Sequence, residues 1–424
     1  MNYQKEEIKE GITLHQINTE NFKTNLYAIF LAVPLKKENV TLDALIGAVL
    51  RRGTNNFQTQ EQISKELEAM YGASFNCGIE KTGDNHILKF YLETLSEEFL
   101  PKPEELTKKC LSILFDIAFN PLTVKGTFKP EYIEGEKKNL KQIIESKIDN
   151  KAKYAYDRCI EEMFKNRPYG LYKFGYTKDL EAITPETLYK HYLELIDNCK
   201  IDIFCSGRLN SQELVKEIKE NENIQKLKNR NPKYIINNEV TESKKPVEPN
   251  TVEESMQVTQ GKLVIGLDIQ NAEEYSKFIA SIYNAILGGG ANSKLFQNVR
   301  EKQSLAYTAG SSYLRTKNAI FIRCGIEIEN YQKAVDTIKQ QLEDMKNGEF
   351  SEEDLKNAKQ LIIASIDNIT EEQDTEITYY YGQELSDRFV TVEEYKKHIT
   401  EVTKQQVIEL AKTIQINTIY FLKD

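Results

Sequence analysis

The apolar positions along the chain alternate between a two-residue period, typical of strands, and the longer period of an amphipathic helix. In the first half, two β-forming runs are followed by two short helical segments and then by two runs that we predict to form a hairpin. Longer helical segments follow, and the half ends with an apolar strand. The predicted strands are 12–17, 24–33, 73–79, 86–92 and 200–207, and the predicted helices are 42–52, 59–70, 103–119, 129–164 and one beginning at 184.

The second half repeats this order of elements. An apolar strand leads into an apolar helix that runs up to Gly288-Gly289-Gly290, and a second amphipathic segment then places Leu295, Phe296 and Val299 on one face. A hairpin, further helices and a closing strand follow. The predicted strands are 263–267, 306–313, 319–328 and 417–422, and the predicted helices after the hairpin are 331–347, 352–368 and one beginning near 391.

This repetition predicts a fold of the α+β class, with two homologous α/β-sandwich domains in which helices flank an antiparallel-rich sheet. We expect the first domain to cover residues 1–220 and the second to cover residues 258–424. Residues 221–257 between them are poor in apolar side chains and rich in Asn, Lys, Glu and Pro. That composition indicates an interdomain linker.

Several helix ends can be read from local sequence. Thr59 and Gln62 have the spacing of a capping box, and Gly72 is a stop signal for the same helix. Thr184 and Pro185 mark the start of a later helix. The run Tyr379-Tyr380-Tyr381 falls within another helical segment, where three consecutive residues point in three directions, so we expect these rings to pack rather than to form a substrate surface.

The segment from Gly288 to Tyr307 is the best candidate for chemistry. The three glycines can adopt positive φ and end the preceding helix, so that the chain can turn back tightly. Arg300 and Tyr307 would then flank one bend, where a guanidinium and a phenol could hold a carbonyl oxygen or a negative charge developing on it. Judged by residue type alone, a surface arginine and a strand tyrosine are more often structural.

Composition narrows the possible functions. The 424 residues can fill two domains, and 40% hydrophobic with 29% charged residues fits a globular protein. The net charge of −9 argues against nucleic acid as the main partner. No apolar run approaches the roughly 18 residues of a membrane span, and the N-terminus lacks an apolar signal region. Six scattered cysteines indicate free, buried thiols in a reducing compartment, so we expect a cytoplasmic protein.

The motif Gly-Gly-Gly, Ser293-Lys294-Leu295-Phe296, Val299-Arg300-Glu301 and Leu305-Ala306-Tyr307 resembles the C-terminal signature of the insulinase/pitrilysin metallopeptidases and their mitochondrial-processing-peptidase relatives. This resemblance implies a two-domain fold of the LuxS/processing-peptidase type. It also implies that Arg300 and Tyr307 bind the substrate backbone and stabilise the tetrahedral intermediate. Gly288, Gly289 and Gly290 would belong to the same substrate-binding surface.

Active members of that family carry His-x-x-Glu-His on a helix just before a turn that here reads Leu50-Arg51-Arg52-Gly53-Thr54. The corresponding ligand positions hold Ala44 and Ala48, and Gly47 stands in place of the general base, so neither imidazole nor carboxylate is present. A third ligand would fall on Ile143, or on Glu145 if the register differs. We therefore predict no metal in this chain.

The four histidines do not restore a metal site by their spacing. His15, His86 and His398 stand alone in the sequence, and each is expected to be structural. His191 is followed four residues later by Leu195 rather than by a second histidine, so a pair on one helical face is missing.

The resemblance therefore implies a non-catalytic, substrate-binding subunit that supplies Arg300 and Tyr307 to a His-x-x-Glu-His partner, with the zinc in that partner and a peptide or unfolded polypeptide as substrate. The isolated chain could also form a homodimer. The alternative is a non-proteolytic peptide-binding scaffold, as in the bacterial YmfF-like group, which is associated by name with modification of translation elongation factor P. A self-sufficient metallopeptidase is the least favoured reading.

Overall fold

The computed structural model describes residues 3–232, 248–270, 276–386 and 389–424, and these divide into two compact units. Neither unit is one continuous stretch. Unit 1 combines residues 1–146, 171–236 and 371–385, and unit 2 combines residues 147–170, 237–370 and 386–424. Within the range expected to be a linker, residues 222–226 form a short helix and residues 250–255 form a strand, whereas residues 233–247 lie outside the described part of the chain.

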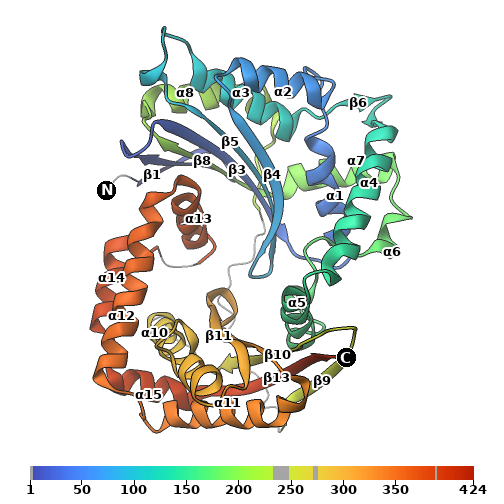
Figure 1. Ribbon diagram of the computed structural model, residues 1–424. Coiled ribbons are helices and arrows are strands. Elements are labelled where there is room, and N and C mark those ends of the chain that lie inside the picture. Colours follow the sequence, from blue (N-terminus) through green and yellow to red (C-terminus); the bar gives the residue numbers. More distant parts are fainter. Residues whose placement is uncertain (1–2, 233–247, 271–275, 387–388) are drawn as a thin grey trace. The chain divides into compact units, whose positions relative to one another are not determined.

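Unit 1 is built on a six-stranded sheet with the order β1-β2-β8-β3-β5-β4 (Figure 1). Neighbouring strands are antiparallel except for β2 and β8, which run parallel. The strands are β1 Tyr3–Lys9, β2 Ile12–Asn18, β3 Thr24–Pro34, β4 Ser74–Thr82, β5 Asn85–Leu95 and β8 Lys200–Gly207, and a separate two-stranded ribbon pairs β6 Thr123–Val124 with β7 Thr127–Phe128. The central strand β3 is apolar on both faces, so both faces of this sheet need a cover.

One face of this sheet packs on most of the helices of unit 1, where Ile29, Leu31 and Ile203 are fully buried. The capping boxes predicted at Thr59 and Thr184 are both confirmed. The helices that unit 1 takes from residues 1–236 are α1 Val40–Leu50, α2 Gln60–Ala69, α3 Leu106–Phe119, α4 Pro130–Glu145, α6 Thr177–Leu180, α7 Pro185–Asn198, α8 Ser211–Glu220 and α9 Glu222–Lys226.

The other face is covered by α13 (Gln373–Glu384), a helix from far along the chain. Tyr381 packs edge-on against Phe30 with 4.5 Å between ring centroids, and Tyr380 stacks on Tyr3 at 4.3 Å. Tyr380 and Tyr381 are buried, and Tyr379 packs against the same cluster. The expectation that these three rings pack is therefore confirmed.

Unit 2 repeats the plan with a five-stranded sheet in the order β11-β12-β10-β13-β9. The strands are β9 Asn250–Ser255, β10 Gly261–Ile269, β11 Ala306–Leu314, β12 Ala319–Ile326 and β13 Ile414–Lys423. Each strand matches one of unit 1 in sheet position and chain order, and the one parallel pair, β13 with β9, occupies the place of β8 with β2. The predicted pair of α+β sandwiches with antiparallel-rich sheets is thus confirmed.

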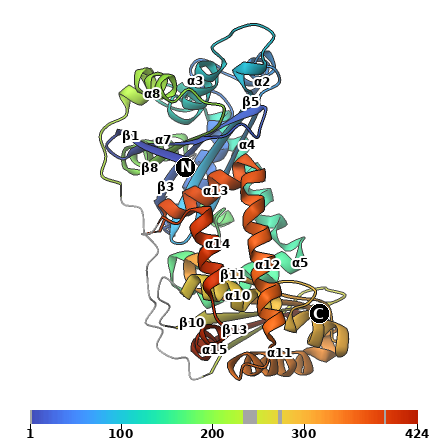
Figure 2. The ribbon, with the colours of Figure 1, turned by 90° about the vertical axis from the view of Figure 1, so that its left-hand side faces the viewer.

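The helices of unit 2 lie around this sheet, and α12 and α14 run side by side (Figure 2). They are α5 Lys151–Met163, α10 Ser276–Gly288, α11 Tyr331–Lys346, α12 Glu352–Asp367, α14 Val392–Glu401 and α15 Lys404–Thr413, with the π-helix η4 at Phe296–Lys302. No helix of the described residues is long and apolar enough to cross a bilayer.

The prediction of one long helix over 129–164 was wrong. The helix breaks after α4, a short 3₁₀ turn covers Ser146–Ile148, and Asn150 caps a new helix, α5, through an acceptor bond from the backbone N–H of Lys153 at 3.0 Å. The helical period continues across the break, which is why the apolar pattern did not reveal it. α4 belongs to unit 1, whereas α5 belongs to unit 2 and packs on β10 and β13.

Glu376 on α13 makes the packing of this helix on the sheet of unit 1 depend on pH. Burial raises the pKa of its carboxyl to about 7, whereas the unfolded chain should titrate near the ordinary glutamate value. Between those two pH values the unfolded chain loses the proton that the folded chain keeps, so stability falls as the pH rises. We expect Glu376→Gln to be more stable than the wild type by about 1–2 kcal/mol at pH 8 and equally stable at pH 4, as measured by urea unfolding. Asp374→Asn, an exposed acid on the same helix, should show no such pH-dependent gain.

Candidate functional site

The predicted motif lies entirely in unit 2 and runs from the end of α10 through the π-helix η4 to the edge strand β11. Buried Leu295 and Val299 anchor η4, and Asn298 donates to Gln341 on α11 at 2.6 Å. A wide π turn changes the direction of side chains relative to an α-helix, and such turns are frequent at functional sites. Ser304, which joins η4 to β11, has a left-handed φ of +52°, a conformation that a non-glycine residue adopts only where its surroundings hold it.

Arg300 lies on η4 with 43% of its side chain exposed. Its guanidinium lies over the ring of Phe296, 4.5 Å from the centroid, and its Nε is 3.5 Å from a carboxylate oxygen of Glu301. The aromatic contact orients the planar group. The ion pair is long and exposed, so it holds the cation only weakly and leaves it available to a ligand.

Tyr307 lies in a β-bulge at the start of β11, because the pairing with β12 shifts register between Ala306 and Thr308. The bulge leaves the side chain 59% exposed, and the phenol donates to Glu327 at 2.5 Å. That hydrogen bond to a carboxylate raises the pKa of Tyr307, so the phenol keeps its proton at neutral pH. Bulges often re-aim a side chain next to a site. The sequence spacing does not reveal the pairing of Tyr307 with Glu327, because Tyr307 lies at the start of β11 and Glu327 directly follows β12.

None of Gly288, Gly289 and Gly290 uses the positive φ that glycine allows. Gly288 and Gly289 serve close packing instead. A Cβ on Gly288 would lie 2.5 Å from the backbone nitrogen of Ser311, so this glycine lets α10 approach β11. Gly290 has open space beside it, apart from the tip of Leu361 at 3.9 Å.

A cavity of about 300 Å³ adjoins these glycines, between the end of α10 and α12. Its lining combines apolar groups, such as Ile286 and the exposed Leu361, with polar ones, such as Ser293 and Asp354. Beside it, β11 is the terminal strand of its sheet, and its outer edge pairs with no strand of the described residues. An unpaired edge is in general a template for an added strand.

The positions that resemble zinc ligands lie on α1 and α4 of unit 1. Ala44 is buried, and a Cβ at Gly47 would meet no atom within 4 Å, so the space for a side chain is present while the side chain is not. The backbone carbonyl of Gly47 accepts from the thiol of Cys77 at 3.6 Å. Ile143 on α4 is 43% exposed, and Glu145 is exposed and 3.9 Å from Lys141. These residues offer no ligand set for zinc.

The buried carboxylate of this region, Glu136 on α4, forms ion pairs with two arginines. It is 1% exposed and lies 3.5 Å from Arg51 and 3.3 Å from Arg52, both just beyond α1, while Asn139 donates to it at 3.2 Å. Two guanidinium groups neutralise a charge that would otherwise be costly to bury. The contact therefore joins α1 to α4 by charge pairing.

The structure also brings together two histidines that stand apart in the sequence. His86 and His191 bond to the two carboxylate oxygens of Asp43, at 3.0 Å and 2.7 Å. Burial raises the pKa of Asp43, but the hydrogen bonds from His191 and His86 outweigh it and hold the pKa below its usual value. The ring nitrogens contact the carboxylate rather than a common centre, and the described residues contain no group of three or more His, Cys, Asp or Glu that could hold a metal.

The remaining two histidines are structural as well. His15 stacks on Phe204, with 4.2 Å between ring centroids, and bonds to Asp202 at 2.9 Å. His398 lies against Phe278 at 4.5 Å. Each ring thus has packing and polar partners within its own unit.

Comparison with known proteins agrees with this geometry. A family model described as the peptidase M16 inactive domain matches residues 182–362. The chain is 34% identical over 417 residues to a Bacillus subtilis protein named "Probable inactive metalloprotease YmfF", a match that covers 97% of this chain and 96% of that one. A conserved protein from Enterococcus faecalis superposes with a TM-score of 0.90 and 26% identity, over 100% of this chain and 99% of that one. A peptidase M16 inactive domain from Pseudomonas fluorescens superposes with a TM-score of 0.78 and 17% identity, over 100% and 98%.

The chain therefore belongs to the peptidase M16 family, which confirms the resemblance to the insulinase metallopeptidases. Within that family it stands with the inactive, YmfF-like bacterial proteins.

Replacing the buried carboxylate should be costly for the fold. We expect Glu136→Ala to lower the free energy of unfolding by about 2 kcal/mol, because it leaves a cavity and removes the shared partner of Arg51 and Arg52. The change is measured by urea unfolding monitored by circular dichroism. Glu134→Ala, on the same helix but with a side chain 68% exposed, is the matched control and should stay within about 0.5 kcal/mol. Equal losses in both variants would contradict the role given to the Glu136 contacts.

The purified chain should hold no stoichiometric zinc, because Ala44, Gly47 and Ala48 supply no donor atoms. Dialysis against micromolar zinc followed by elemental analysis measures the metal content. One tightly held zinc per chain would contradict this prediction.

Proposed function

We propose that this chain is the non-catalytic, substrate-binding subunit of a heterodimeric zinc peptidase of the M16 family. The partner would carry His-x-x-Glu-His and the zinc, and this chain would supply Arg300 and Tyr307 to an extended or unfolded peptide. The observation that carries the proposal is an asymmetry between the two units. The motif of unit 2 keeps an exposed cation and an exposed phenol beside a strand edge that pairs with no strand in the described part of the chain, whereas the equivalent of the metal site in unit 1 holds alanine and glycine.

The geometry suggests a role for each side chain. A peptide added along the edge of β11 would present its carbonyl groups near the bulge at Tyr307. The guanidinium of Arg300, positioned by Phe296, would bind a substrate carbonyl. The protonated phenol of Tyr307 would turn from Glu327 to donate to the oxyanion, so Glu327 would act as a positioning residue for the free state.

The peptide-binding scaffold remains the second candidate, because the same exposed groups would hold a peptide that is never cut. The association with elongation factor P rests on likeness to one branch of the family alone. For either function we place the chain in the cytoplasm, since its six cysteines are free and five of them are buried. The isolated chain could pair with a second copy when its partner is missing.

The test is reconstitution with a His-x-x-Glu-His subunit of the family from the same cell. We expect the mixture to cleave an unfolded peptide and Tyr307→Phe to lower kcat by about 100-fold with little change in KM, since one oxyanion donor is typically worth about 3 kcal/mol in the transition state. Tyr313→Phe, on the same strand but bonded to Asn318, is the control and should keep full activity.

Arg300→Ala should raise KM and lower kcat, and Arg300→Lys should restore little if the carbonyl is held by the planar guanidinium. Lys302→Ala on the same π-helix controls for general loss of charge. Peptide binding that is weakened by Arg300→Ala, but with no cleavage in any mixture, would favour the scaffold function. Cleavage unaffected by either variant would refute the proposed subunit role.

A further inference from the structure

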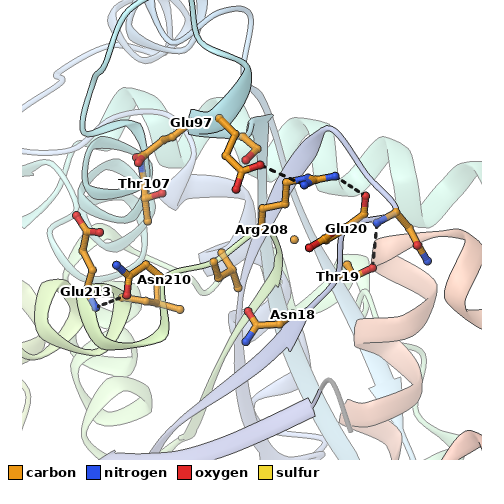
Figure 3. A pocket seen from close by; sticks show the side chains of 14 residues that line it. Asn18, Thr19, Glu20, Glu97, Thr107, Arg208, Asn210 and Glu213 are labelled. Carbon is orange, nitrogen blue, oxygen red and sulfur yellow. Dashed lines mark hydrogen bonds and ion pairs between the residues drawn. The ribbon is translucent and has the colours of Figure 1, made fainter.

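A second cavity, of about 720 Å³, lies in unit 1 and is independent of the Arg300 and Tyr307 motif (Figure 3). It opens where β2 and β8 end, and because these strands are parallel, their carboxyl ends meet at one edge of the sheet. The loops after β2 and β5 and the first turn of α8 complete its walls. Loops at the carboxyl ends of parallel strands are a common place for ligands.

The arginine in the lining of this cavity, Arg208, already binds other residues of the cavity wall. Arg208, next after β8, pairs with Glu98 at 3.1 Å and donates to the backbone carbonyl of Glu20 at 2.8 Å (Figure 3). Its guanidinium also lies over the ring of Phe99, 5.3 Å from the centroid. Arg208 therefore ties the wall loops together. An anionic ligand would find no uncommitted arginine or lysine in the lining, which instead carries four glutamates.

Two lining residues, Ser96 and Asn18, each have a buried polar atom with no hydrogen-bond partner among the described residues. Ser96 is 1% exposed, and the unpartnered atom is its Oγ. In Asn18 the unpartnered atom is Oδ1, whereas Nδ2 of the same amide donates to Ser211 at 3.3 Å. An unpaired buried acceptor costs free energy that a ligand donor can recover. With Nδ2 of Asn18 donating to Ser211, its Oδ1 is left to accept from an N–H or O–H group, and the hydroxyl of Ser96 can accept from such a group as well.

The glutamates of the lining supply the matching charge. One carboxylate oxygen of Glu97 accepts from the backbone N–H of Thr107 at 2.6 Å and so caps α3, and Glu98 is paired with Arg208. The side chains of Glu20 and Glu213 are exposed at the rim and form no ion pair within the described part of the chain. Free acceptors in the base and free carboxylates at the rim both favour a ligand that is cationic and rich in donors.

We propose that this cavity binds aliphatic primary ammonium groups, with a linear polyamine as the ligand class. One ammonium group would donate to Ser96 and Asn18 in the base, and another would pair with Glu213 or Glu20 at the rim. The volume accommodates a chain with several such groups. A lysine side chain offers the same ammonium chemistry, so the source of the ligand is an outcome of the test.

The test is isothermal titration calorimetry of the full chain with spermidine at low salt. We expect saturable one-site binding that weakens as salt is added. Glu213→Gln should weaken it about threefold to fivefold. Glu220→Gln, at the far end of the same helix and outside the lining, is the matched control and should bind like the wild type.

Ser96→Ala separates a ligand role from a structural one. Because the hydroxyl has no partner in the fold, the variant should unfold at an unchanged or higher urea concentration while binding spermidine about threefold to tenfold more weakly. A loss of stability with unchanged binding would overturn the proposal. So would the absence of saturable spermidine binding, an equal effect of Glu213→Gln and Glu220→Gln, or equally tight binding of succinate or 1,8-octanediol.

A second titration, with Nα-acetyl-lysine methylamide, separates the possible sources of the ammonium group. Binding of spermidine alone assigns the site to a free polyamine. Tight binding of both compounds assigns the site to ammonium groups in general, including that of a protein lysine.

Discussion

The structure depends on the need to bury two apolar faces of each sheet. In unit 1, Ile29 and Leu31 face one layer of helices while Phe30 and Phe204 face the other side, and α13 closes that second side. In unit 2, Phe321 and Tyr420 face α5, which covers the equivalent side of the second sheet. The two covering helices come from equivalent places in the repeat, after α4 and after α12, and each belongs to the unit whose strands come from the other half of the chain.

Two of the edge strands, β4 in unit 1 and β11 in unit 2, occupy equivalent places and pair with no further strand of the described residues, and the candidate motif occupies the second of these edges. Buried Leu295 and Val299 anchor the motif in unit 2, whereas the side chains of Arg300 and Tyr307 are exposed. Left-handed Ser304 and the bulge at Tyr307 adjoin each other, so local backbone strain is concentrated at the point that sets the direction of the phenol.

Much of this could be predicted from the sequence. The alternation of apolar residues located the hairpins, and the capping signals located helix starts such as Thr59 and Thr184, because both depend on neighbours within a few residues. Assignments that depend on distant residues could not be made. The pattern 129–164 looked like one helix because the helical period continues across Asn150, and only the second sheet, far along the chain, decides where α5 packs. The strands β1 and β9 are short and polar, so only pairing with a neighbour reveals them.

For the candidate site, the sequence identified Arg300 and Tyr307 as residues, but the partners that orient them, Phe296 and Glu327, emerge only from the fold. The glycines illustrate a different limit. Their presence was informative, but the reason for it was close approach of α10 to β11 rather than a reversed turn, and residue type cannot separate those two uses. Likewise, His86 and His191 meet on Asp43 from three separate elements, with no spacing to reveal it.

The pairing of Glu136 with Arg51 and Arg52 makes a metal site difficult to rebuild in unit 1 by substitution. Those two cations stand within one helical turn after Ala48, so imidazoles restored at positions 44 and 48 would have to gather a divalent ion beside fixed positive charge. Removing the arginines first would strand a buried carboxylate, and removing the carboxylate first would loosen the packing of two helices. Substitutions at positions 44, 47 and 48 alone would therefore leave the buried carboxylate bound to two arginines, and a rebuilt metal site would need coordinated changes on both α1 and α4.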